Sequence, residues 1–126
     1  MSKPPEGETE RLFGGAHASR QDRIVLALWE QSREQMLSEL NVFEQVAAAL
    51  EQGTVDDDLR QRAAVEAHKL IGSFGILRIR EGSRLATVLE DLLRGTEIRK
   101  ADPAALRDTV STMRRMLTEG PPRQDP

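Results

Sequence analysis

Residues 54–75 read TVDDDLRQRAAVEAHKLIGSFG, and this stretch decides the fold of the chain. Three aspartates at 56–58 stand near its beginning, where the dipole of a helix favours negative charge. Apolar side chains then recur every three or four residues, which is the spacing of one buried helical face. They are Leu59, Ala63, Ala67, Leu70 and Phe74. We therefore predict a helix that opens at Thr54 and packs this face into a core.

A longer helix is predicted before this stretch, from Ser19 to the glycine at position 53. Ser19 and Asp22 have the spacing of a capping box. The apolar residues that follow hold one helical face for several turns. They are Trp29, Met36, Leu40, Phe43, Ala47 and Leu50.

Two further helices are predicted after it. The first runs from about Arg80 to Arg94 and is closed by Gly95; its apolar residues are Leu85, Val88, Leu89 and Leu92. The second starts at Asp102-Pro103, a capping residue followed by proline at the first helical position. Its stripe is Leu106, Val110, Met113 and Leu117. Four amphipathic helices joined by short connections favour an all-α fold, an antiparallel four-helix bundle.

The composition limits the domain organisation and the classes of function. A length of 126 residues fits one domain. We expect the bundle in residues 19–119, between a flexible leader, 1–18, and a flexible tail, 120–126, both containing Pro and Gly. The net charge of −3 gives no general attraction to nucleic acid or membrane. The apolar run from Ile24 to Trp29 is far shorter than the ~20 residues of a membrane span. A cytoplasmic monomer is the expectation.

Metal and thiol chemistry are not expected. The chain has no cysteine, which excludes disulfides and Cys-based zinc sites. Its two histidines, His17 and His68, are far apart and have no metal-ligand spacing. We expect no cofactor, and we interpret His17 as an uninvolved residue of the leader.

His68 is the candidate for chemistry. At 100° per residue it points about 130° from the centre of the buried face, toward solvent or the boundary. Its neighbours on that side are mostly small or apolar: Gln61, Ala64, Val65, Ile71, Gly72 and Gly75. Each glycine within a helix costs about 1 kcal/mol relative to alanine. Two of them imply either close helix packing or a need to leave the imidazole uncovered, and we expect a side chain at position 72 to crowd the ring. Histidine is partly neutral and nucleophilic near pH 7, so an accessible one suits phosphoryl transfer between proteins.

The stretch Ala67-His68-Lys69-Leu70-Ile71-Gly72-Ser73-Phe74-Gly75 resembles the phospho-acceptor motif of histidine-phosphotransfer (HPt) domains. In that motif an apolar residue follows the histidine by two positions, glycine by four and a small residue by five. The resemblance covers about Leu28 to Leu93 and includes Glu81-Gly82-Ser83-Arg84-Leu85-Ala86 and Leu89-Glu90. It is similar to a subgroup with the pattern AHKLxGSxG, found in bacterial, notably cyanobacterial, phosphorelays. The resemblance implies a four-helix bundle with an exposed acceptor histidine and a break in the first helix near Glu30 to Arg33.

The resemblance also implies a function in two-component signalling. The chain would be a phosphorelay intermediate that accepts a phosphoryl group on His68 and exchanges it with an aspartate of a response-regulator receiver domain. Its partners would be that receiver, a sensor histidine kinase, or both. Mg²⁺ would belong to the receiver. No nucleotide-binding segment is recognisable in the sequence, so we expect a phosphocarrier without its own kinase activity.

One position departs from the family pattern. Many members have lysine three residues after the histidine, whereas this chain has Ile71 there, and Lys69 lies about 100° round the helix from His68. The expected phosphoryl environment and docking surface are Gln61, Ala64, Val65, Lys69, Ile71, Gly72 and Gly75. Val65 and Ile71 fit either a core edge or a docking surface.

Alternative functions remain open at this stage. The substitution by Ile71 favours a non-catalytic HPt-like module that docks receiver or kinase domains without phosphotransfer. A structural bundle that dimerises through Leu37, Val42 and Val46 is a third hypothesis. Basic residues also allow two interpretations. Arg78, Arg80 and Arg84 either steer an acidic receiver pocket or form a solvated cluster at a helix end, and Arg114-Arg115 are interpreted as charges on the solvent face.

Overall fold

Asp56 begins the helix that carries His68. Its backbone is extended, and its carboxylate accepts a hydrogen bond of 2.8 Å from the backbone N–H of Leu59. This bond satisfies one of the amides left unpaired at a helix N-terminus. In the computed structural model, which describes residues 20–119, the helix α4 spans Asp57–Ile76. The predicted opening at Thr54 was wrong, because the side chain that caps the helix comes two residues later. The predicted buried face is confirmed, since Leu59, Ala63, Ala67, Leu70 and Phe74 are all buried.

The first helix of the bundle consists of two segments, α2 (Arg20–Glu39) and α3 (Asn41–Glu51), interrupted at Leu40. Leu40 keeps nearly helical dihedral angles, φ −68° and ψ −19°. Arg114 of the last helix donates hydrogen bonds on both sides of the break, to the carbonyl of Leu37 at 3.4 Å and to Oδ1 of Asn41 at 2.7 Å. A side chain inserted among the backbone hydrogen bonds is a known cause of helix irregularity.

The break expected near Glu30 to Arg33 was wrong, because these residues lie within α2. No glycine or proline stands near them to interrupt the helix. The predicted stripe of the first helix is buried except for Leu50, which is half-buried. Ser19 lies outside the described residues, and Asp22 forms an ion pair with Arg78 at 3.6 Å.

A tight turn joins α4 to the next helix. The N–H of Ile79 donates to the carbonyl of Phe74 at 2.9 Å, and the N–H of Arg78 donates to the carbonyl of Gly75 at 3.0 Å. These two bonds define the Schellman motif. Arg78 has a φ of +61°, in the place where glycine is most common. The helix α5 then spans Arg80–Arg94 with Gly95 at its C-cap, as predicted.

A short 3₁₀ turn, η1 (Ile98–Lys100), leads to α6 (Pro103–Thr118). The carboxylate of Asp102 accepts a hydrogen bond of 3.0 Å from the N–H of Ala104, and Pro103 occupies the first turn. The start predicted from the Asp-Pro pair is therefore confirmed. So is the predicted stripe, because Leu106, Val110, Met113 and Leu117 are buried.

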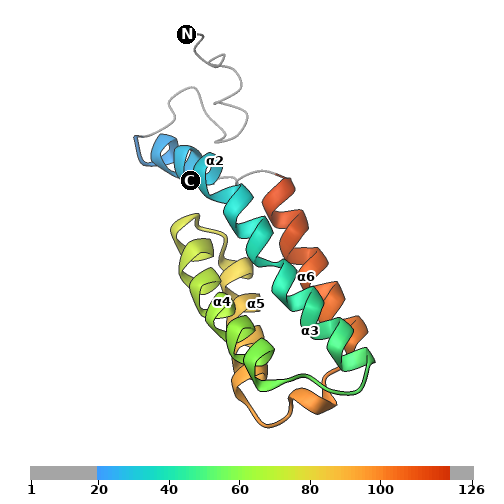
Figure 1. The fold of residues 1–126 in the computed structure, drawn as a ribbon. Coiled ribbons are helices and arrows are strands. Elements are labelled where there is room, and N and C mark those ends of the chain that lie inside the picture. Colours follow the sequence, from blue (N-terminus) through green and yellow to red (C-terminus); the bar gives the residue numbers. More distant parts are fainter. Residues whose placement is uncertain (1–19, 120–126) are drawn as a thin grey trace.

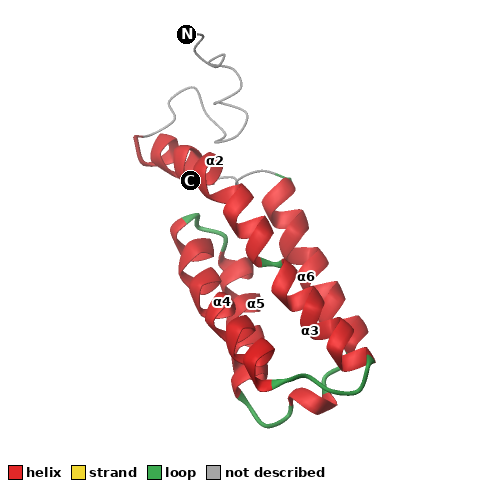
Figure 2. Ribbon diagram, in the orientation of Figure 1, coloured by secondary structure: helices red, strands yellow, loops and turns green. Residues whose placement is uncertain are grey.

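These elements form an antiparallel four-helix bundle, in which α2 and α3 together make the first helix (Figure 1). Within residues 20–119, Figure 2 shows helices and their connecting loops and no strand. The helices α4 and α5 form one closely packed pair, and α3 and α6 form another. The α4–α5 turn lies at the opposite end of the bundle from the other two connections (Figure 1). The prediction of an all-α bundle is confirmed.

The buried face of α5 matches the predicted one only in part, since Leu89 is buried as predicted but the centre of the face lies elsewhere. Its buried residues are Gly82, Ala86, Leu89 and Leu93. Val88, predicted in the core, is half exposed, and Leu85 and Leu92 are half-buried. A Cβ atom added to Gly82 would lie 2.3 Å from Cδ1 of Phe74, so α5 approaches α4 closely through a residue without a side chain. The prediction followed large apolar residues and therefore missed a contact face made partly of small ones.

The side of the first helix proposed for dimerisation is not an exposed apolar face. Val46 is fully buried, and Leu37 and Val42 pack against the core. Arg114 also differs from its prediction as a solvent-face charge, since it contacts Leu37, Asn41 and Glu44. None of the helices in residues 20–119 has both the length and the apolar composition needed to cross a membrane.

Candidate functional site

His68 lies in the middle of α4 on the side opposite the buried face. Its side chain is 71% exposed. Leu70 and Ala67, its neighbours in sequence, are fully buried, because a helical step of 100° turns successive side chains to different sides. The outward direction predicted from the periodicity is what the structure has. A ring this exposed is accessible to the active site of another protein.

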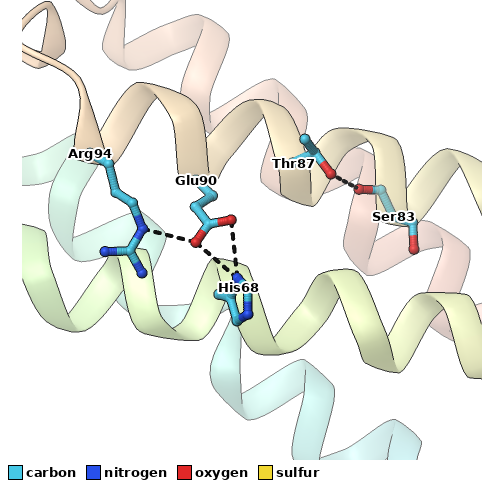
Figure 3. A network of polar contacts seen from close by, with 5 residues as sticks. All are labelled: His68, Ser83, Thr87, Glu90 and Arg94. Carbon is cyan, nitrogen blue, oxygen red and sulfur yellow. Dashed lines mark hydrogen bonds and ion pairs between the residues drawn. The ribbon is translucent and has the colours of Figure 1, made fainter.

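Glu90 of α5 holds one nitrogen of the His68 ring. The Nδ1 atom lies 3.0 Å from Oε2 and 3.2 Å from Oε1 of the Glu90 carboxylate (Figure 3). An ionised carboxylate only accepts hydrogen bonds, so Nδ1 carries the proton in this contact. The lone pair of a neutral ring is then on Nε2, the nitrogen farther from Glu90. The contact therefore fixes both the tautomer and the orientation of the ring.

Arg94 completes a chain of three polar side chains. Its Nε atom donates to Oε2 of Glu90 at 2.8 Å, across one turn of α5 (Figure 3). Hydrogen bonds from Arg94, and then from His68, hold the pKa of the Glu90 carboxyl below its usual value. Glu90 therefore stays ionised at neutral pH and remains a hydrogen-bond acceptor for His68. The Glu90 side chain is only 16% exposed and contacts both flanking groups.

The register of the α4–α5 hairpin brings these residues together. His68 and Glu90 are equally far along the chain from Ile79, at the end of the tight turn. Gly75 and Ser83 are also equally far from Ile79, and a Cβ atom on Gly75 would lie 3.6 Å from Ser83 Oγ. Ser83 in turn donates a hydrogen bond of 2.6 Å to the carbonyl of Ile71. The alignment of α4 with α5 is thus fixed by contacts that each join a residue before the turn to a residue after it.

The glycines near His68 have different surroundings. A Cβ atom added to Gly72 meets nothing within 4 Å. The expectation that a side chain there would crowd the ring was therefore wrong for a side chain as small as the methyl group of alanine. Gly72 lies open beside the histidine, and no packing within the described chain requires glycine there. Of the two glycines in α4, Gly75 faces Ser83 of α5 at an ordinary contact distance, and the closest approach of the two helices is at Gly82, against the Phe74 ring.

The other predicted neighbours of His68 divide into exposed and buried groups. Gln61 and Gly72 are exposed, as is Val65 at 51%. Ala64 is buried, which excludes it as a docking residue in this conformation, and Ile71 is half-buried against the core.

Lys69 contacts a different set of side chains. Its Nζ atom lies 3.3 Å from Oε1 of Glu66 and 4.0 Å from Oε1 of Glu39. It is thus engaged with the carboxylates of α4 and α2. Of the arginines interpreted as a possible steering cluster, Arg78 pairs with Asp22 and Arg84 with Glu81. His17 lies outside the described residues.

Three residues of the site were not predicted: Glu90, Arg94 and Ile76. Ile76 shares the outer side of α4 with His68 and is 62% exposed. Glu90 belongs to the Leu89-Glu90 pair of the family resemblance, but that pair did not indicate a contact with the histidine. A carboxylate followed four residues later by arginine is an ordinary helical pair, so the spacing of Glu90 and Arg94 did not indicate one either. Their positions follow from the hairpin register, which needs the length of the turn. No group of three or more carboxylate or histidine side chains within residues 20–119 is arranged to hold a metal ion.

Comparison with known proteins adds one finding. A family model described as "Hpt domain" matches residues 24–119 of the chain, from the first turns of α2 to the end of α6. The match therefore includes His68, Glu90 and Arg94. No curated protein and no solved structure matches the chain.

Proposed function

The chain belongs to the Hpt domain family, and from this premise we propose that it is a phosphorelay intermediate whose phosphoryl-accepting residue is His68. Hpt domains take part in histidine phosphotransfer and interact with receiver domains and kinases. The observation that carries the assignment to His68 is its exposed ring with Nδ1 held by Glu90. This arrangement leaves the Nε2 lone pair outside the contact with Glu90, on a ring that is mostly exposed.

The proposed reaction is an in-line transfer between His68 and an aspartyl phosphate of a receiver domain. The Nε2 lone pair attacks phosphorus, the N–P bond forms, and the bond from phosphorus to the aspartyl oxygen breaks, which leaves a carboxylate on the receiver. The proton on Nδ1 stays in place, so the ring becomes positively charged. Mg²⁺ bound by the receiver would neutralise charge on its side of the reaction.

Glu90 supports this reaction in both directions. Its carboxylate stabilises the positive charge that the ring acquires as the N–P bond forms. In the reverse transfer, the proton retained on Nδ1 allows the ring to leave phosphorus as a neutral imidazole. Glu90 is therefore proposed as a positioning residue that holds the proton at Nδ1 throughout the cycle.

The exposed side of α4 offers a docking surface around His68. Val65 and Ile76 are both more than half exposed and lie on either side of the histidine along the helix, with Gly72 between His68 and Ile76. We propose that a receiver domain packs on these apolar groups, which excludes water from the transfer. We also propose that this chain acts in the cytoplasm and has no kinase activity of its own.

The test is phosphotransfer from kinases and phosphorylated receivers of the same organism, measured as acid-labile label. We expect label on the wild type, none on His68→Gln, and normal label on His17→Gln, which removes the other histidine of the chain. Circular dichroism checks that each variant is folded. Label on His68→Gln would contradict the assignment. Receiver binding by an unlabelled wild type would instead favour a docking module without transfer.

A further inference from the structure

Two glutamates from different helices share one lysine where α4 adjoins the first helix. The Oε1 atom of Glu66, on α4, lies 3.3 Å from Nζ of Lys69. Glu39 is the last residue of α2, and its Oε1 atom lies 4.0 Å from the same Nζ. A single ammonium group thus stands against two carboxylates. Because the closer carboxylate, that of Glu66, is sufficient to pair with it, the negative charge of Glu39 is in excess.

These carboxylates are poorly solvated. The side chain of Glu39 is only 10% exposed, and that of Glu66 is 26% exposed. Within residues 20–119, the Oε2 atoms of both are buried and accept no hydrogen bond. Glu39 Oε1 accepts one of 3.1 Å from the amide of Gln35. A buried charged oxygen without a partner is costly, so a further cation that reached the two carboxylates would relieve an unfavourable arrangement.

Both glutamates line a groove of about 720 Å³ between the first helix and α4. The neutral polar side chains of the groove are mostly amides, which can accept as well as donate hydrogen bonds. These amides are Gln35, Asn41, Gln45 and Gln61. The other charged residues of the groove are Asp58 and Arg62, which form an ion pair with each other at 3.1 Å. The charge that is left uncompensated in the groove is therefore negative.

A basic side chain fits this groove better than a metal ion does. In the part of the chain that the structure describes, no third carboxylate or histidine joins the pair in a metal-binding arrangement. A guanidinium has five N–H donors in one plane and can bond to a carboxylate through two of them. Its other donors would meet the amide oxygens of the groove. The terminal torsion of a glutamate is soft, so the carboxylates can rotate to meet the incoming group.

We propose that this groove binds an arginine side chain of the protein that docks on His68. Val65 lines the groove and precedes His68 by three residues, and Lys69 follows the histidine directly. A protein seated on the histidine therefore also reaches the groove. The inference rests on the function proposed above for the identity of this partner. The partner's guanidinium balances Glu39 as Lys69 balances Glu66, and the pair of carboxylates becomes neutralised as a whole.

The first test titrates the whole chain with acetyl-arginine-amide at constant ionic strength. Binding is read from the ¹³C chemical shifts of the side-chain carboxyl carbons. We expect saturable shifts at Glu39 and Glu66 and none of comparable size at Asp58, a carboxylate of the same groove that is already paired. Glu39→Gln is expected to reduce the shift at Glu66 several-fold, and the matched control Asp58→Asn to leave it unchanged. Equal shifts at Asp58 and Glu39, or shifts that sodium chloride reproduces, would overturn the proposal.

The stability of Glu39→Gln separates a binding role from a structural one. Lys69 keeps Glu66 as its closer partner in this variant, and a buried charge is removed. We therefore expect the midpoint of chemical denaturation to stay the same or to rise. A purely structural bridge between α2 and α4 predicts the opposite, a lower midpoint with unchanged binding of acetyl-arginine-amide, and that result would overturn the proposal.

The second test measures the transfer of label from a phosphorylated receiver at increasing receiver concentrations. We expect Glu39→Gln to raise the concentration that gives half the maximal rate by about tenfold, with the maximal rate unchanged. Asp58→Asn is expected to change neither quantity. Binding of acetyl-arginine-amide without this rise would overturn the assignment of the arginine to the docked partner. Failure of the proposed function has a different signature, since the wild type then exchanges no label with any receiver or kinase. The titration still decides whether the groove binds a guanidinium.

Discussion

Arginine and carboxylate side chains take part in polar contacts at two pairs of helices in this bundle, with different results. Between α6 and the first helix, Arg114 uses all three guanidinium nitrogens, on Glu44, Leu37 and Asn41. At the α4–α5 pair, Arg94 uses only Nε, which donates to Glu90. The same carboxylate also contacts Nδ1 of the exposed His68. The first arrangement is saturated and holds helices together. The second leaves donors and a ring nitrogen available for a partner, although the residue types are nearly the same.

The largest expected effect concerns two glycines of the α4–α5 pair. Gly82→Ala would place a methyl group 2.3 Å from the Phe74 ring, so we expect a loss of about 1–3 kcal/mol in the free energy of unfolding. Gly72→Ala meets open space, and we expect it to stabilise the helix by up to about 1 kcal/mol. Chemical denaturation measures both. Equal changes in the free energy of unfolding would mean that Gly82, between the two helices, is packed no more tightly than Gly72 on the outer side of α4.

A smaller effect is expected at the α3–α6 pair. Arg114→Ala removes hydrogen bonds to three residues, so we expect a loss of about 1–2 kcal/mol in the free energy of unfolding, with phosphotransfer unchanged. Arg115→Ala is the matched control, because Arg115 is exposed and contacts only Glu119 of the same helix end. We expect it, like Arg94→Ala, to change stability by less than about 0.5 kcal/mol. If Arg94→Ala cost as much stability as Arg114→Ala, the contrast between the two pairs would be lost.

The smallest expected effect is on the pH dependence of stability. The pKa of Glu90 is lower in the folded chain than its usual value of 4.5, because Arg94 and His68 hydrogen-bond to the ionised form. Its contribution is therefore present above the unfolded pKa and is lost as the pH falls through the lower folded pKa. We expect the difference in unfolding free energy between the wild type and Glu90→Gln to shrink as the pH falls from 6 to about 3. A difference that grew over this range would contradict the ionised state of Glu90.

Much of the fold was predictable because local signals coincide with the tertiary structure. Asp102-Pro103 marks the start of α6, and Gly95 marks the end of α5. The stripes of large apolar residues in α4 and α6 are the buried faces. The predictions fail where the decisive contact comes from another helix. Leu40 interrupts the first helix beside the hydrogen bonds from Arg114, and Gly82 is buried because the Phe74 ring lies against it.

The site was predictable only on one helix. The position of His68 on the outer side of α4 follows from the helical period, and its exposure agrees. Glu90 and Arg94 stand on α5, and their approach to His68 depends on how the two helices are aligned. Ala64 was expected on the surface, but α5 covers that edge of α4, so the angle around one helix was not sufficient.

The Schellman turn at Arg78 and Ile79 has a consequence for how this domain can vary. His68 and Glu90 meet because they are equally distant from the turn, so the number of residues in the turn sets which α5 side chain faces the histidine. One inserted residue would rotate the following positions by about 100° and move Glu90 away from the ring. The connections at the other end of the bundle set no such alignment for the site. We therefore expect changes in chain length at those connections to leave the contact between His68 and Glu90 in place, whereas a change in the length of the α4–α5 turn would break it.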